Sequence, residues 1–190
     1  MMTSPANTIL AEWNDLGLDD AAEVILPCNG SQVWATLVAY NRPFDSPAAL
    51  FATSDKIWRS LPVEDWQEAF DSHPRLGEHK AKSATEKSLG WSAGEQSAAN
   101  PDDAVREALA QGNHEYEEKF GRIFLLCATG RSAAEMLTIL QKRMQSDPAT
   151  ELHEAAEEQR LITRLRLRKW LNMPAMTCAE LVASIGTEAA

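Results

Sequence analysis

The sequence predicts an all-α fold, a single-domain bundle of about seven or eight helices with one short buried extended segment. Three observations support this prediction. Apolar side chains recur at three- and four-residue steps through most of the chain, glycines and prolines fall mostly between these patterns, and alternating strand patterns are nearly absent. A length of 190 residues is typical of one domain. We therefore expect residues 1–190 to form one domain, with residues 173–190 less ordered.

Three long helices have the clearest patterns. In residues 102–120, apolar side chains share one face, Asn100-Pro101 supplies a start and Gly121 a stop. Residues 132–145 form a second amphipathic pattern. Pro148 is suited to the first turn of a third helix, which reaches Trp170 or Leu171.

The remaining elements are shorter. The run Ile123-Phe124-Leu125-Leu126-Cys127-Ala128 is apolar, too short for a convincing helix, and bounded by glycines, so we expect a buried extended segment. Shorter helices are expected at residues 7–15, 31–40, 47–60 and 63–70.

Composition limits the classes of function. A formal net charge of −10 opposes binding to nucleic acid or to an anionic membrane, and no apolar run is long enough to span a bilayer. A small-molecule partner is favoured, and an anionic one needs locally placed cations. The chain shows no secretory signal, which favours the cytoplasm. The cysteines Cys28, Cys127 and Cys178 are odd in number and widely spaced, so we expect reduced thiols and no zinc site.

His73 is a candidate proton-transfer residue. Because Pro74 disfavours the helical conformation in the residue before it, the helix ending near Phe70 must stop here, and the imidazole lies at a helix exit. Its ordinary pKa near ~6.5 suits acid/base chemistry at neutral pH. For a lone histidine before proline, a surface or capping role is the simpler explanation. A metal site with Glu78 and His79 matches no known spacing and is disfavoured.

Ser92-Ala93-Gly94-Glu95 has two interpretations. The Ser-x-x-Glu pattern is typical of a capping box at the start of a helix. Alternatively, this junction presents Ser92, Glu95 and Gln96 to a polar ligand.

Arg166 is anomalous, because it projects into the middle of the apolar face of the last long helix. A buried guanidinium requires a counter-anion, which can be an internal carboxylate or an anionic ligand. Arg160, Arg164 and Arg168 fall on the far side of the same helix, where solvated charges are expected.

Six segments form a pattern that spans most of the chain: Tyr40-Asn41-Arg42-Pro43-Phe44, His73-Pro74, Ser92-x-x-Glu95-Gln96, Asn113-x-x-Tyr116-x-x-Lys119-Phe120-Gly121, Gly130-Arg131-Ser132 and Leu165-Arg166-Leu167. Together they resemble the 2-oxo-4-hydroxy-4-carboxy-5-ureidoimidazoline (OHCU) decarboxylase family, which acts last in the conversion of urate to (S)-allantoin. The sequence departs from the pattern at Gly121-Arg122-Ile123-Phe124, where a glycine, an aromatic residue, proline and phenylalanine are expected, which leaves the shape of that pocket wall open.

The resemblance implies a cofactor-free lyase with a pocket between helices and no metal. His73 is then the catalytic acid/base, assisted by Glu95, and Pro74 forms a pocket wall. Arg166 holds an anionic or carbonyl group. The other implied substrate-binding residues are Ser92, Gln96 and, through backbone groups, Phe124, Leu125, Leu126, Cys127 and Ala128.

The resemblance also explains the absence of a cofactor, because a C=N bond next to the carboxylated carbon accepts the electrons that CO2 leaves. A homodimer is expected from the family. The alternative is a non-catalytic helical module that binds a ureide or a protein partner. A metal-dependent hydrolase is a weaker third hypothesis.

Overall fold

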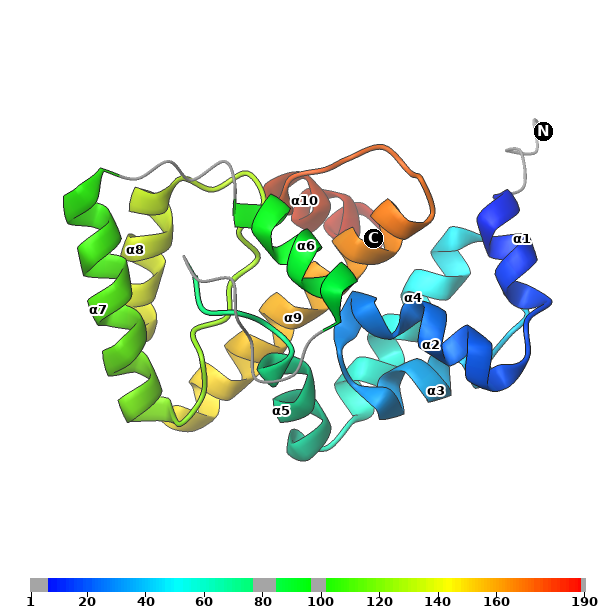
Figure 1. Ribbon diagram of the computed structural model, residues 1–190, viewed down its shortest axis with the longest axis horizontal. Helices are drawn as coiled ribbons and strands as arrows, with labels where there is room; N and C mark the ends of the chain where they lie inside the picture. Colours follow the sequence, from blue (N-terminus) through cyan, green and yellow to red (C-terminus); the bar gives the residue numbers. More distant parts are fainter. Residues whose placement is uncertain (1–6, 77–84, 97–101, 189–190) are drawn as a thin grey trace.

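The structure, a computed structural model, describes residues 7–76, 85–96 and 102–188. Its regular elements within these ranges are ten α-helices (Figure 1). No helix in the described ranges is both long and apolar enough to cross a membrane. The helices are α1 (Thr8–Asn14), α2 (Leu18–Asn29), α3 (Gln32–Tyr40), α4 (Pro47–Ser60), α5 (Val63–Asp71), α6 (Glu86–Gln96), α7 (Asp103–Phe120), α8 (Ala133–Arg143), α9 (Pro148–Trp170) and α10 (Cys178–Glu188).

The longest helix, α9, is the central element of the fold. Pro148 lies in its first turn, where a missing N–H does no harm, and the side chain of Asp147 accepts hydrogen bonds from the first free amides. Helices α2, α4, α5 and α10 pack against α9, while α7 and α8 pack against each other at one end of the molecule (Figure 1). Much of the circumference of α9 is therefore covered.

Residues 123–128 form the predicted extended segment, and all six are buried. Successive side chains of an extended chain point to opposite sides. Those of Ile123, Leu125 and Cys127 join the larger hydrophobic cluster around α2 to α5 and α9, whereas those of Phe124, Leu126 and Ala128 join a second cluster with α7 and α8. The segment thus lies between two hydrophobic clusters.

Side chains provide the backbone hydrogen bonds that a neighbouring strand would provide in a sheet. The Leu125 carbonyl accepts a hydrogen bond from Arg143 at 2.7 Å, and the Cys127 carbonyl accepts one from Arg131 at 3.0 Å. The Cys127 amide donates to Glu158 at 2.8 Å. Because buried backbone groups without partners are destabilising, these three side chains allow an isolated extended segment to run through the interior.

The long helices and the four shorter ones are confirmed within one or two residues at most ends, but the predicted number of helices was too low. The prediction missed α2, α6 and α10. Pro27 lies inside α2 and obscured its pattern. In the predicted tail at 173–190, α10 occupies Cys178–Glu188, and Leu181 is buried in the core.

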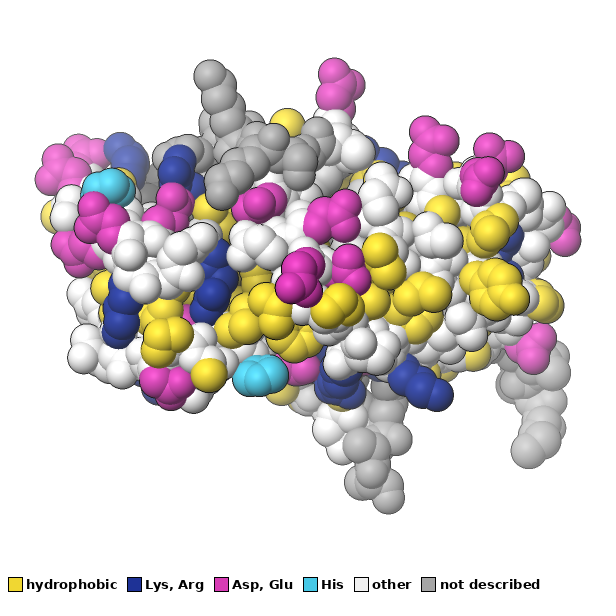
Figure 2. Space-filling view, turned by 90° about the horizontal axis from the view of Figure 1, so that it is seen from below, with side chains coloured by type: hydrophobic (Ala, Val, Ile, Leu, Met, Phe, Trp, Pro, Cys, Tyr) yellow, Lys and Arg dark blue, Asp and Glu magenta, His cyan; other side chains and the backbone are white. Residues whose placement is uncertain are grey.

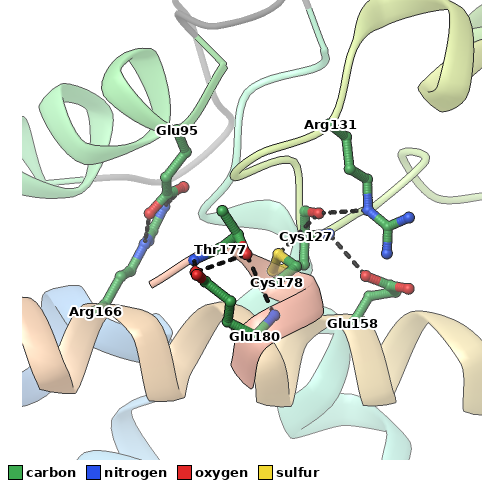
Figure 3. The surroundings of a disulfide bond; sticks show 8 residues. All are labelled: Glu95, Cys127, Arg131, Glu158, Arg166, Thr177, Cys178 and Glu180. Carbon is green, nitrogen blue, oxygen red and sulfur yellow. Dashed lines mark hydrogen bonds and ion pairs between the residues drawn. A yellow bond between two sulfur atoms is a disulfide. The ribbon is translucent and has the colours of Figure 1, made fainter. Parts of the chain in front are cut away.

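The prediction of reduced thiols was also wrong for two of the three cysteines. Cys127 and Cys178 form a disulfide bond across a sequence separation of 51 residues, and only Cys28 is free (Figure 3). Cys178 is the first residue of α10. Its amide also donates a hydrogen bond to the Thr129 carbonyl at 3.1 Å, which holds the start of α10 beside the end of the extended segment. This proximity depends on the packing of α10 on α9, which spacing in the sequence does not reveal.

Arg160 and Arg164 are buried, contrary to the prediction that they are solvated. They are 6% and 5% exposed, and α4 covers their side of α9. Their guanidinium groups lie 2.8 and 3.1 Å from the same carboxylate oxygen of Asp55. The Asp55 carboxylate therefore compensates two buried charges.

Candidate functional site

His73 lies directly after α5, as its position before Pro74 predicts. Helix α5 ends at Asp71, and the His73 amide still donates to the Phe70 carbonyl at 3.0 Å. The imidazole is only 6% exposed, so the surface interpretation is wrong. Its Nε2 is buried and has no hydrogen-bond partner among the described residues. A buried nitrogen of this kind is available to a ligand that brings its own donor or acceptor.

Burial determines the protonation state of His73. Removal of the ring from water lowers its pKa well below the ordinary value near 6.5, and the positive charge of Arg166 lowers this pKa further, against a smaller opposing effect of the Gln159 side chain. The imidazole is therefore neutral at neutral pH. In this state it can accept a proton.

A small cavity of about 20 Å³ adjoins His73. This volume holds about one water molecule, whereas small-molecule sites usually measure about 300–1,000 Å³. Most of the predicted site residues surround it. Its lining residues are His73, Pro74, Leu76, Ser92, Glu95, Phe124, Leu125, Leu126, Ala128 and Ile162.

Of the predicted substrate-binding residues 124–128, Cys127 alone is absent from the cavity lining, and its side chain points toward Cys178. Its predicted contribution was through backbone groups, which are bonded to Glu158 and Arg131. The side chain of Gln96, and the residues Glu78 and His79, lie outside the described part of the chain.

Ser92 and Glu95 lie within α6, so the capping-box interpretation is wrong. The helix begins at Glu86, six residues before Ser92. A spacing of three residues places both side chains on one face of the helix. Ser88 precedes Ser92 by one turn on the same face. This face is directed at Arg166.

Arg166 meets an internal carboxylate, which decides between the two counter-anions that the sequence left open. Its Nε lies 2.8 Å from Glu95 Oε1 and one Nη lies 2.9 Å from Glu95 Oε2, a two-pronged ion pair between α9 and α6 (Figure 3). The other hydrogen bonds of the guanidinium go to Ser92 at 2.9 Å, Ser88 at 3.2 Å and the Pro27 carbonyl at 3.3 Å.

These five hydrogen bonds equal the number of N–H donors in a guanidinium group. Arg166 can bind a substrate carboxylate only when one of its present partners releases a donor. Glu95 is the partner that best fits this role, because its side chain is 20% exposed whereas that of Arg166 is 1% exposed. In this arrangement the Glu95 carboxylate is the counter-ion of Arg166, and Glu95 also lines the His73 cavity.

Arg143, Glu151 and Tyr116 support the site, and their grouping was not predicted from the sequence. Both oxygens of the Glu151 carboxylate are paired with Arg143, and the Tyr116 hydroxyl donates to Glu151. Arg143 also holds the Leu125 carbonyl of the extended segment. A signal for Glu151 was present, because on a helical wheel it falls within about 20° of Ile162 on the apolar face of α9.

No group of three or more potential metal ligands is found in the described ranges. His114 and His153, the two other described histidines, are exposed. The ionisable side chains that line the cavity are the His73 imidazole and the Glu95 carboxylate, and the Arg166 guanidinium is paired with this carboxylate. Such a set can move protons and hold an anion.

Comparison with known proteins identifies the family. The family model described as OHCU decarboxylase matches residues 14–168. The chain belongs to the OHCU decarboxylase family. The family match contains all the site residues described above.

Individual relatives point in the same direction. The chain is 36% identical over 155 residues to the uric acid degradation bifunctional protein TTL of Arabidopsis thaliana, which covers 80% of this chain and 48% of the relative. It thus spans about half the length of that protein. It is 31% identical over 154 residues to the 2-oxo-4-hydroxy-4-carboxy-5-ureidoimidazoline decarboxylase of Amia calva, which covers 78% of this chain and 83% of the relative.

Solved structures share the fold. An OHCU decarboxylase crystallised in the presence of (S)-allantoin superposes with a TM-score of 0.68 and 35% identity, covering 77% of this chain and 96% of its own. An (S)-allantoin synthase, at 17% identity and a TM-score of 0.65, covers 85% of this chain and 53% of its own and supports the fold alone.

Proposed function

We propose that this member of the OHCU decarboxylase family converts OHCU to (S)-allantoin and CO2 without a metal or organic cofactor. The observation that carries the proposal is the buried, neutral His73, whose Nε2 has no partner among the described residues, at a cavity that Ser92, Glu95 and the extended segment also line. The similarity to the Amia calva decarboxylase supports the choice of substrate.

The substrate itself supplies the electron sink for the reaction. When the C–C bond to the carboxylate breaks, its electron pair forms a C=C bond to the ureido-bearing carbon. The π pair of the C=N bond moves onto nitrogen, which takes up a proton, and CO2 departs. The hydroxyl on the same carbon then becomes a carbonyl. Its proton is lost while another proton is added to one face of the neighbouring ureido-bearing carbon. The reaction therefore adds one proton to nitrogen, removes the hydroxyl proton and adds another proton to carbon, and only the last addition requires stereochemical control.

His73 and Glu95 are the proposed groups for these proton transfers. The neutral imidazole accepts the hydroxyl proton, because its lowered pKa leaves it unprotonated at neutral pH. General acid/base catalysis by such a group typically contributes about 10² to 10⁴-fold. Arg166 orients the substrate by holding an anionic or carbonyl group after Glu95 has released a donor. Pro74, Ser92, Gln96 and backbone groups of residues 124–128 are proposed to complete the binding site.

The test is the rate of (S)-allantoin formation, followed by circular dichroism when urate, urate oxidase and hydroxyisourate hydrolase supply OHCU. We expect the wild-type protein to accelerate the signal over spontaneous decay, and His73→Ala to lose at least about 10²-fold of this acceleration. His114→Ala, at an exposed position on α7, is the matched control. Full stereospecific turnover by His73→Ala would contradict the assigned role.

A non-catalytic ureide- or protein-binding module remains the alternative. It predicts binding without acceleration of OHCU decay by the wild-type protein. Glu95→Gln separates the roles of the carboxylate, because glutamine still offers an oxygen to Arg166 but no negative charge. We expect this variant to stay folded and to lose activity.

We also propose that the protein acts as a homodimer on its small-molecule substrate in the cytoplasm, and that it binds neither nucleic acid nor membrane. A stripe of exposed apolar side chains on α3 supports self-association: Val33, Leu37 and Tyr40 are 41%, 39% and 75% exposed and share one helical face. Figure 2 shows hydrophobic side chains gathered among acidic ones on the side of the molecule where α3 and α5 lie. Light scattering on the purified protein tests the dimer.

A further inference from the structure

A second cavity adjoins the ion pair between Glu95 and Arg166. It measures about 480 Å³ and lies between the C-terminal ends of α6 and α9 and the residues that follow α9. Glu95 and Arg166 both line this outer cavity, and Glu95 also lines the His73 cavity. We propose that Arg168 and Lys169 form an anion-binding site in the outer cavity, where the carboxylate of the substrate is captured before it reaches His73. This proposal rests on the proposed function.

The two cavities differ greatly in volume. The His73 cavity, at about 20 Å³, holds one water molecule, whereas the outer cavity lies within the range of about 300–1,000 Å³ found for small-molecule sites. By volume, the outer cavity, unlike the His73 cavity, is large enough for a ureidoimidazoline ring. The ring reaches His73 only when the ion pair of Glu95 and Arg166 has given way.

Two cations other than Arg166 line the outer cavity. Neither Arg168 nor Lys169 forms an ion pair with a carboxylate among the described residues. Arg168 donates to the Pro174 carbonyl at 3.2 Å, and its Nε is buried without a partner in the same part of the chain. The Lys169 ammonium lies 5.7 Å from the centre of the Trp91 ring. A carboxylate would satisfy the Arg168 guanidinium and neutralise both cations.

The charge of the whole protein makes these two cations more important for capture of an anion. With a net charge of −10, the long-range field repels an anionic substrate, so capture depends on cations at the entrance. The Glu95 carboxylate does not oppose this, because Arg166 neutralises it. Leu165, Met173 and Met176 add an apolar wall for the ring. The ligand class is therefore a small cyclic or ureido carboxylate.

The kinetic test uses variants that remove the two charges. Lys169→Gln is expected to raise KM about two- to fivefold at unchanged kcat, the fold-change typical of an exposed ion pair. The double variant Arg168→Gln/Lys169→Gln is expected to raise KM about tenfold and to weaken the fall of kcat/KM with added salt, because screening acts on these charges. The single variant Lys169→Arg keeps the positive charge and should therefore have the wild-type KM. Lys142→Gln, an exposed position on α8, is the control with the same change of charge.

A binding test separates this site from the proposed function. Allantoate, a ureido carboxylate, is titrated into the wild-type protein and the double variant while tryptophan fluorescence is followed. Weaker allantoate binding by the double variant, with or without OHCU turnover by the wild type, supports the site, whereas absence of turnover overturns only the proposed function. The site is overturned if allantoate binding is absent or equal in both proteins, or if KM and its salt dependence match those of Lys142→Gln.

Discussion

The disulfide between Cys127 and Cys178 should contribute substantially to stability. In the loop-entropy description, a cross-link stabilises the native state by restricting the unfolded chain, and the effect depends on the number of residues enclosed. A separation of 51 residues corresponds to about 4 kcal/mol at 25 °C. We therefore expect reduction of this bond to lower the free energy of unfolding by up to about 4 kcal/mol.

Urea unfolding, followed by far-UV circular dichroism with and without a reducing agent, measures the difference. Cys178→Ser is the control, because a reducing agent should not change its stability further. We expect the reduced protein to remain folded, because the backbone hydrogen bonds of Cys127 to Glu158 and Arg131 do not require the disulfide.

Thiol counting provides an independent check. In the unfolded, unreduced protein we expect one alkylated cysteine, Cys28, and three after reduction. In the folded protein Cys28 should not react, because burial raises the pKa of its thiol to about 12. The reasoning is refuted if the unreduced protein already shows three reactive thiols, or if oxidised and reduced proteins unfold at the same urea concentration.

Three further perturbations follow from the structure. Because the folded pKa of His73 lies below the unfolded value near ~6.5, the unfolded chain binds more protons at low pH, and the wild type should lose up to about 2 kcal/mol more than His73→Ala between pH 6.5 and 5, measured by urea unfolding. Gly30→Ala should destabilise the protein by at least about 1–2 kcal/mol and lower kcat, because its φ is +103° and a Cβ would lie 2.6 Å from that of Ser72, next to His73; thermal unfolding and the allantoin assay check this. Asp55→Asn should cost about 3 kcal/mol in urea unfolding because it leaves two buried arginines undercompensated, whereas Glu12→Gln, at an exposed position, should cost almost nothing.

The helical pattern was readable in the sequence wherever one face of a helix packs and the other is solvated. Helices α7 and α8 have this form, and their boundaries were close to those predicted. Helix α9 was located correctly, but its arginines were misplaced. Because neighbouring helices cover several of its sides, a wheel that assumes one buried face assigns Arg160 and Arg164 to solvent.

Part of the candidate site was likewise predictable from the sequence, and part was not. The family pattern identified His73, Ser92, Glu95 and Arg166, and the structure brings the first three to one cavity and pairs the last two. The support of the extended segment by Arg143 was not predicted. Its partners come from different helices, and no local spacing relates them.

By itself, the sequence determined the helical class, the buried extended run at residues 123–128 and the need of Arg166 for an anion, because each depends on local periodicity or on the high free energy of an unpaired buried charge. Only the tertiary structure decided that Glu95 is that anion and that Cys127 meets Cys178. The physical reason is that these pairings join residues 71 and 51 positions apart, and their proximity results from the packing of α6 and α10 around α9.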